Sequence, residues 1–108
     1  MDKEWINKNS EDLRIKPDVY ITILRTTLEP GAQDVNELDK IIDSGDLKQI
    51  RFIAHRLKGT FSNLRVKTVA SQAEAVCVLS KTIGNRAKMR EHFIRLKNAF
   101  EEFKGQIE

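Results

Sequence analysis

The 108-residue sequence has few of the residues that cross-link or interrupt a chain: one cysteine, two prolines and five glycines. A single cysteine, Cys77, cannot form an intramolecular disulfide, so a disulfide-stapled fold is excluded and a reducing, cytoplasmic setting is expected. The scarcity of glycine and proline disfavours a turn-rich all-β fold. No apolar run approaches the roughly 20 residues of a membrane span, and we expect no direct membrane insertion.

The sequence also lacks a strong excess of charge of one sign. It contains 19 basic and 16 acidic residues, which gives a formal net charge of +3. The acidic residues are interspersed among the basic ones, so the dense Lys/Arg stripe of a nucleic-acid-binding protein is absent and no nucleic-acid partner is expected. The mild positive excess favours acidic protein partners. The length suits one domain with a single core.

Helical periodicity of apolar residues dominates the chain. In this interpretation residues 1–16 form an N-terminal leader or short capping helix, and residues 17–108 form a helical bundle domain. Pro17 suits the first turn of a helix, and Pro30-Gly31 interrupts the pattern that follows, so one kinked helix and two separate helices both fit residues 18–44. Three more amphipathic helices are predicted over residues 46–64, 67–81 and 85–106. The fold class is therefore all-α, an antiparallel four-helix bundle with an additional short N-terminal helix.

The helix predicted over residues 46–64 has a well-defined outward face. Gly45 is a natural helix stop and Asp46 a good N-cap for the next helix. At about 100° per residue, His55 lies roughly 150° from the centre of the apolar stripe, so it is predicted to face solvent. Five other residues lie on the same outward surface: Lys48, Arg51, Phe52, Gly59 and Ser62. Lys58 lies at its edge.

Three of these residues are unusual on a solvent face. A glycine inside a helix costs about 1 kcal/mol relative to alanine, and a side chain at Gly59 would lean over His55, so the glycine leaves the imidazole accessible. Phe52 exposes an aromatic ring of the kind used in transient docking. Lys58 supplies a positive charge that can offset a phosphoryl group. A lone exposed histidine is ordinarily only a polar surface residue, but this combination favours a reactive one.

The residues from Ala54 to Gly59 read A-H-R-L-K-G, which resembles the A-H-x-L-K-G signature of histidine-containing phosphotransfer (HPt) domains. The spacing of Gly45-Asp46 upstream, and of Phe61 and Leu64 downstream, is also similar to the family, and the resemblance extends over roughly residues 18–80. It implies a four-helix bundle in which His55 accepts the phosphoryl group, Lys58 assists and Gly59 clears the site.

The resemblance has departures beyond the histidine helix. Arg65 stands where the family commonly has glycine, directly after the leucine at position 64. Ala73, Val76 and Cys77 occupy places where the family often has a cysteine and then a Leu-Glu pair. These departures concern the turn and some partner contacts rather than the chemistry at the histidine.

The function implied by the resemblance is histidine phosphotransfer in a multistep two-component phosphorelay, in which a phosphoryl group moves between receiver-domain aspartates and His55. The expected partners are receiver domains and a sensor histidine kinase, with Lys48, Arg51, Phe52 and Ser62 in the docking patch. The chain is then a phosphoryl carrier rather than an autonomous kinase, and a monomer is expected.

No metal site or cofactor is expected on this chain, because the His55 face offers no carboxylate; Mg²⁺ is expected on the receiver. The protein is cytoplasmic, either free or as the C-terminal domain of a membrane-bound hybrid sensor kinase.

Two alternatives present a histidine on a similar helix. A histidine kinase dimerisation region requires an ATP-binding domain with glycine-rich elements, for which this chain has neither the length nor the motifs. A degenerate bundle of the same fold that only binds protein partners stays open, because of the departures at Arg65 and Cys77. His92 is interpreted as a residue at the boundary of the core, and Cys77 as a packing residue.

Overall fold

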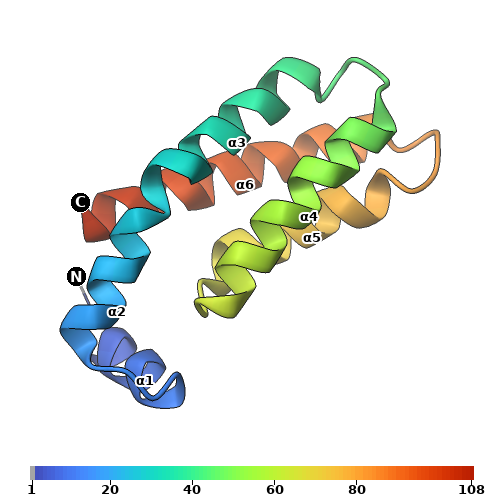
Figure 1. Ribbon diagram of the computed structural model, residues 1–108. Coiled ribbons are helices and arrows are strands. Elements are labelled where there is room, and N and C mark those ends of the chain that lie inside the picture. Colours follow the sequence, from blue (N-terminus) through green and yellow to red (C-terminus); the bar gives the residue numbers. More distant parts are fainter. Residues whose placement is uncertain (1) are drawn as a thin grey trace.

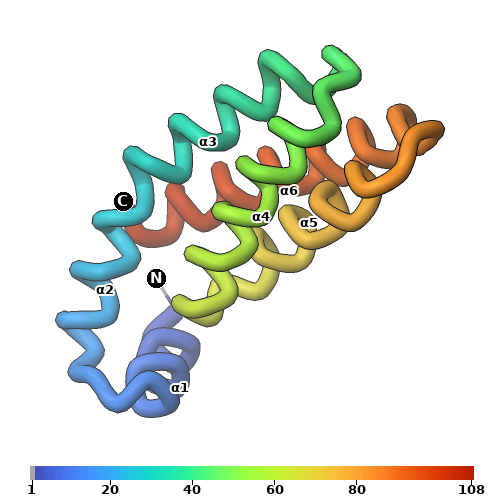
Figure 2. Tube along the Cα trace, turned by 45° about the vertical axis from the view of Figure 1, so that its right-hand side comes forward, coloured from blue at the N-terminus to red at the C-terminus, as the bar shows by residue number. Residues whose placement is uncertain are grey.

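The computed structural model describes residues 2–108, and these residues fold into helices joined by short turns (Figure 1). The helices are α1 (Lys3–Asp12), α2 (Pro17–Thr26), α3 (Leu28–Ile41), α4 (Leu47–Asn63), α5 (Lys67–Leu79) and α6 (Arg86–Ile107). Helices α3 to α6 run alternately up and down as an antiparallel bundle. Helix α2 continues beyond the end of the bundle, and α1 folds back beside it (Figures 1 and 2). The prediction of an all-α bundle with a short N-terminal helix is confirmed.

No helix between residues 2 and 108 is both long and apolar enough to cross a lipid bilayer.

The helix that carries His55 begins where the sequence predicts. The carboxylate of Asp46 accepts a hydrogen bond from the backbone N–H of Gln49 at 3.1 Å, which caps the first turn of α4. Gly45, just before it, has a φ of 82°, a left-handed conformation that glycine adopts without steric cost. The register of α4, and therefore the direction of His55, is fixed from its first turn.

The interruption between α2 and α3 lies at Thr27, which differs from the predicted position at Pro30-Gly31. Pro30 lacks an N–H, and its ring crowds the carbonyl four residues earlier in a helix, that of Thr26. The helix therefore breaks upstream of the proline, and Pro30 itself lies in the first turn of α3. The hydroxyl of Thr27 donates to the carbonyl of Leu24 at 2.6 Å. Of the two alternatives for residues 18–44, the structure therefore shows two helices, separated by a single residue.

Helix α5 ends at Leu79, so the predicted end at Lys81 is wrong by two residues. The backbone N–H of Lys81 bonds to the carbonyl of Val78, three residues earlier, at 3.2 Å, which tightens the chain out of the helix. The hydroxyl of the buried Ser80 donates to the carbonyl of Cys77 at 2.6 Å. These local hydrogen bonds provide partners for backbone carbonyls at the end of α5, so a further helical turn is not needed.

The core lies where the apolar stripes of the bundle helices meet. Phe61 of α4 packs edge-on against Phe100 and Phe103 of α6, with ring centroids 6.1 and 5.4 Å apart. The apolar stripe of α6 is buried along its length, at Met89, Phe93, Leu96, Phe100, Phe103 and Ile107. Leu47 and Leu64 are only partly buried, because they lie at the two ends of the α4 stripe, where fewer helices surround them.

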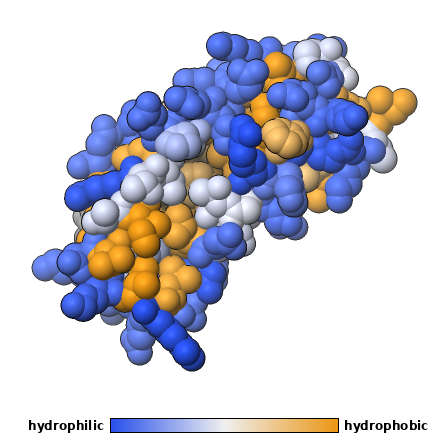
Figure 3. All heavy atoms as spheres, in the orientation of Figure 1, coloured by the Kyte–Doolittle hydropathy of each residue, from blue (hydrophilic) through white to orange (hydrophobic). Residues whose placement is uncertain are grey.

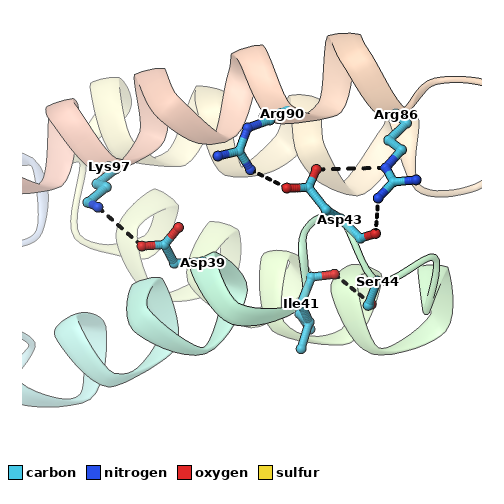
Figure 4. Close-up of polar contacts among 7 residues, drawn as sticks. All are labelled: Asp39, Ile41, Asp43, Ser44, Arg86, Arg90 and Lys97. Atoms are coloured by element: carbon cyan, nitrogen blue, oxygen red, sulfur yellow. Dashed lines mark hydrogen bonds and ion pairs between the residues drawn. The ribbon is translucent and has the colours of Figure 1, made fainter.

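Ion pairs join the end of α3 to α6 (Figure 4). Asp43 follows α3, and its carboxylate lies 2.5 Å from the Arg90 guanidinium and 3.8 Å from that of Arg86. In the last turn of α3, Asp39 pairs with Lys97 at 3.2 Å. These partners are exposed, so each pair contributes only about 0–1 kcal/mol.

The other end of the bundle is held by Tyr20. Its buried hydroxyl donates a hydrogen bond to the backbone carbonyl of Leu64, at the end of α4. The ring of Trp5 from α1 packs against the Tyr20 ring, with centroids 5.7 Å apart. Asp12, also on α1, pairs with Arg65 at 2.8 Å. Helices α1, α2 and α4 are thereby joined at one corner of the molecule.

Gly31 is predicted to be the glycine least tolerant of substitution. A Cβ at this buried position would lie 2.6 Å from Cε1 of Phe100, and that ring is confined by Phe61 and Phe103. We expect Gly31→Ala to lower the free energy of unfolding by about 1–3 kcal/mol, the usual range for overpacking. Chemical denaturation measures it. The matched control is Gly105→Ala in α6, whose new Cβ would meet nothing within 4 Å and which should not be destabilising. Equal stability of the two variants would contradict the close packing of α3 against Phe100.

The ionisation of Tyr20 tests its burial. Burial raises the pKa of the phenol from 10.0 to about 12, against the smaller opposing effect of the Arg65 charge. The pKa of the Tyr20 phenol is higher in the folded state than in the unfolded state. The contribution of the buried, protonated phenol to the free energy of unfolding is therefore fully present below pH 10 and is lost as the pH rises towards 12. Tyr20 is the only tyrosine in the sequence, so tyrosinate absorbance reports on it alone. We expect a midpoint near 12 in the folded protein and near 10 in denaturant; a folded midpoint near 10 would show that the ring is solvated.

Candidate functional site

His55 lies in the middle of α4, on the side opposite the buried stripe. The stripe consists of the residues of α4 that are almost fully inaccessible to solvent: Ile50, Ile53, Ala54, Leu57 and Phe61. His55 itself is exposed, as the periodicity predicts. Its imidazole makes no hydrogen bond with any other part of the chain between residues 2 and 108. The described part of the chain therefore engages neither ring nitrogen.

The space beside His55 is open because of Gly59. A Cβ built on Gly59 would meet no atom within 4 Å, in contrast to the one on Gly31. The bundle therefore gives no packing reason for glycine at position 59. A larger side chain there would extend toward the preceding turn, which carries His55. The helix thus contains an interior glycine that costs about 1 kcal/mol relative to alanine and that packing does not explain.

Lys58, predicted at the border of the His55 face, is half-buried. Its ammonium nitrogen lies 3.6 Å from a carboxylate oxygen of Glu74 on α5. Both side chains are accessible, so the pair is weak and can exchange for a stronger anion. The sequence analysis did not identify Glu74, because nothing in the spacing along one helix shows which residue of the next helix lies opposite.

Phe52, one turn before His55, is 61% exposed, and its ring is supported from one side. The guanidinium carbon of Arg56 lies 5.3 Å from the ring centroid. Arg56 is held in turn by Asp34 of α3 through two hydrogen bonds of 2.5 and 3.1 Å, which raise the pKa of the guanidinium. Asp34 and Arg56 are a second contact between helices that the sequence analysis missed. They orient an exposed aromatic ring on the His55 face.

The remaining predicted residues extend this face along α4. Lys48 and Ser62 are exposed and Arg51 is partly buried. In chain order Lys48, Arg51, His55 and Ser62 are three, four and seven residues apart, spacings that place them on one side of the helix. Neither Lys48 nor Arg51 has an ion-pair partner in the described part of the chain. The face is therefore apolar at Phe52 and positively charged around it.

A second exposed apolar area lies outside the predicted set. Figure 3 shows apolar side chains gathered over α2, at the lower left of the view. On this helix Val19 is 42% exposed and Ile23 only partly buried. The sequence signal was present, since both are apolar residues on a helix predicted to be amphipathic. Periodicity alone does not show which apolar residues of such a helix stay exposed.

The other residues considered from the sequence lie away from this face. The imidazole Nδ1 of His92 on α6 is 2.8 Å from the side-chain oxygen of Gln72 on α5, and the ring is partly buried, as expected of a boundary residue. Cys77 is buried in the core. Within residues 2–108 no three His, Cys, Asp or Glu side chains are grouped so that they could hold a metal ion.

Comparison with models of known protein families assigns most of the chain to one of them. The model of the Hpt domain matches residues 22–106, and the chain belongs to this family. No curated protein and no solved structure matches the chain. Hpt domains are phosphotransfer modules of two-component signalling, and they interact with receiver domains and histidine kinases. The match leaves α1 and the first half of α2 outside its bounds.

Proposed function

We propose that this Hpt domain carries a phosphoryl group on His55 and exchanges it with the aspartates of receiver domains in a multistep phosphorelay. The observation that carries the proposal is the exposed His55 beside Gly59, a helix-interior glycine that no neighbouring atom of the bundle requires.

The transfer is an in-line displacement at phosphorus. The lone pair of one neutral imidazole nitrogen of His55 attacks the phosphorus of an aspartyl phosphate, a nitrogen–phosphorus bond forms, and the bond from phosphorus to the aspartate oxygen breaks. The aspartate leaves as a carboxylate, and the other imidazole nitrogen keeps its proton. The reverse reaction passes the group to another receiver. Such transfer depends mainly on positioning and charge neutralisation. Mg²⁺, held by acidic residues of the receiver, supplies charge neutralisation on the partner's side.

Phosphorylation adds close to two negative charges to His55, and the positively charged side chains near His55 suit such a group. Lys58, three residues after His55, can leave the weak pair with Glu74 and approach the phosphoryl oxygens. Arg51 lies one turn before His55 and contributes to the positive field. The phosphorylated histidine is thereby held on a face of opposite charge, which suits temporary storage.

Docking of the receiver uses the apolar and positive residues around His55. Phe52, held against Arg56, offers an aromatic contact, and Lys48, Arg51 and Ser62 surround it with charge and hydrogen-bonding groups. The exposed apolar residues of α2 extend the available surface. We propose that the domain acts as a monomer in the cytoplasm, with a sensor histidine kinase at the start of the relay.

Replacement of His55 tests the proposal directly. The chain is incubated with a receiver domain that carries labelled aspartyl phosphate, and the product is examined for acid-labile, base-stable phosphate. We expect labelling of the wild type and none of His55→Gln. His92→Gln, which changes the only other histidine, is the matched control and should label normally. Label that survives in His55→Gln places the site elsewhere. Stable receiver binding without any labelling of the wild type would instead support a binding-only bundle.

Substitutions of Gly59 can distinguish the accessibility of the His55 imidazole from the stability of the helix. Both Gly59→Ala and Gly59→Leu should raise the free energy of unfolding, by up to about 1 kcal/mol, because glycine is the poorest of the three in a helix. Only the leucine covers the imidazole. We expect Gly59→Leu to slow transfer from the receiver by at least about tenfold, since a misplacement of about 1 Å in a reacting pair can cost 100-fold.

The comparison is made by transfer kinetics on the three proteins, with Gly59→Ala as the control for the change in helix propensity. A leucine variant that is more stable and transfers at the wild-type rate would show that Gly59 has no role in access.

A further inference from the structure

Three side chains in contact connect α3 to the exposed aromatic ring beside His55. The guanidinium of Arg56 donates from Nε to Oδ2 of Asp34 at 3.1 Å, and from Nη2 to Oδ1 at 2.5 Å. Both carboxylate oxygens of Asp34 are thus bound by one guanidinium, in the two-pronged geometry that arginine forms with carboxylates. The central carbon of the same guanidinium lies 5.3 Å from the centroid of the Phe52 ring. The position of this ring on α4 therefore depends on a residue of α3.

Asp34 is the fixed end of this connection. Its side chain is only 15% exposed and that of Arg56 is 50% exposed, while Phe52 is 61% exposed. A carboxylate that binds a guanidinium through both oxygens fixes its orientation as well as its place. The pair of Asp39 with Lys97, also made by α3, has one such contact, and an ammonium group acts as a point charge. Arg56 is therefore oriented by its partner, and the exposed ring rests against an oriented group.

The pair with Asp34 changes what Arg56 offers to a partner protein. Its charge is compensated by the carboxylate, whereas Lys48 and Arg51 have no ion-pair partner in the described part of the chain. Arg56 therefore adds little to the positive field around His55. Its other contact is with the aromatic ring, and a guanidinium over one face of a ring leaves the opposite face for an apolar side chain.

Arg56 directly follows His55, at the one position that the A-H-x-L-K-G signature leaves open. It lies four residues after Phe52, so the two side chains are neighbours on the same surface of α4. Asp34 lies outside the signature altogether. A contact built on these positions can differ between domains without disturbing the histidine, lysine and glycine of the signature. Such a contact suits discrimination between partners rather than the transfer itself.

We propose that Asp34 and Arg56 are positioning residues that raise the affinity of this domain for its receiver, by orienting the Phe52 ring to pack against an apolar side chain of that receiver. The inference rests on the exchange with receiver domains proposed above. A ring that already has its bound orientation loses less conformational freedom on docking. The effect is therefore on the affinity for the receiver and not on the rate of transfer within the complex.

A double-mutant cycle between Asp34→Asn and Phe52→Ala tests the proposal, with a receiver domain that labels the wild type as the probe. The dissociation constant is measured with the unphosphorylated receiver, and single-turnover transfer is measured at saturating receiver. We expect Asp34→Asn to raise the dissociation constant about threefold, the effect of ordering one side chain on binding, at an unchanged saturated rate. In the Phe52→Ala background the same change should not raise it, because no ring is left to orient. Equal increases in both backgrounds would overturn the proposal.

Charge alone predicts the opposite sign for Asp34→Asn. Removal of a carboxylate near the His55 face makes that face more positive, which would strengthen the binding of an acidic receiver. The matched control is Asp39→Asn, which removes a carboxylate from the same helix but from its contact with α6, and which should bind as the wild type does. Tighter binding of Asp34→Asn than of this control would show that Arg56 acts as a charge, and the proposal would be wrong.

The free chain allows a second measurement that needs no receiver. The side-chain Nε–H of Arg56 should exchange with water as slowly as that of Arg65, which a carboxylate also holds, and Asp34→Asn should accelerate it. Exchange in the wild type as fast as that of Arg51 would show that Arg56 is not oriented. Labelling of His55 together with such fast exchange would refute this inference alone. Slow exchange with no labelling by any receiver would count against the proposed function instead.

Discussion

Burial of one side of α4 is the constraint on which the rest of the structure depends. Five residues of this helix are almost completely removed from water by the neighbouring helices, and their hydrophobic transfer fixes its rotation about its own axis. The position opposite that side must then face solvent, and this is where His55 lies. Turning His55 inward would require exposing the Phe61 ring, which packs against two rings of α6. Stability and the presentation of the histidine therefore have the same origin.

The exposed side of α4 shows where function is given preference over stability. Gly59 weakens the helix, Phe52 exposes an aromatic ring to water, and the cations around His55 repel one another. Each choice is locally unfavourable by about 1 kcal/mol or less, and the core that the opposite side forms can tolerate the sum. A rigid helix with a locally unfavourable surface is consistent with the proposed function, in which His55 meets different partners from one fixed position.

The sequence predicted the core and the outward face because both follow from the period of a single helix. The buried residues of α6, the cap at Asp46 and the exposure of His55 all depend on neighbours a few residues apart. The break at Thr27 was predicted three residues late, because Pro30 disrupts the carbonyl of the preceding turn rather than its own position. Contacts between helices could not be predicted. The pairs of Asp34 with Arg56 and of Glu74 with Lys58 depend on how far each helix is shifted along its neighbour, which no periodicity along one helix reveals. The roles of His55, Lys58 and Gly59 remain a prediction.

The central claim is that the phosphoryl group resides on His55 and on no other residue. The most direct measurement is the imidazole ¹⁵N spectrum of the chain before and after transfer from a phosphorylated receiver, in which the two histidines give separate signals. The account predicts that one ring nitrogen of His55 shifts and couples to phosphorus, while the His92 signals stay unchanged. Phosphorus coupling at His92, or phosphate incorporation with no change in the His55 ring, would contradict it.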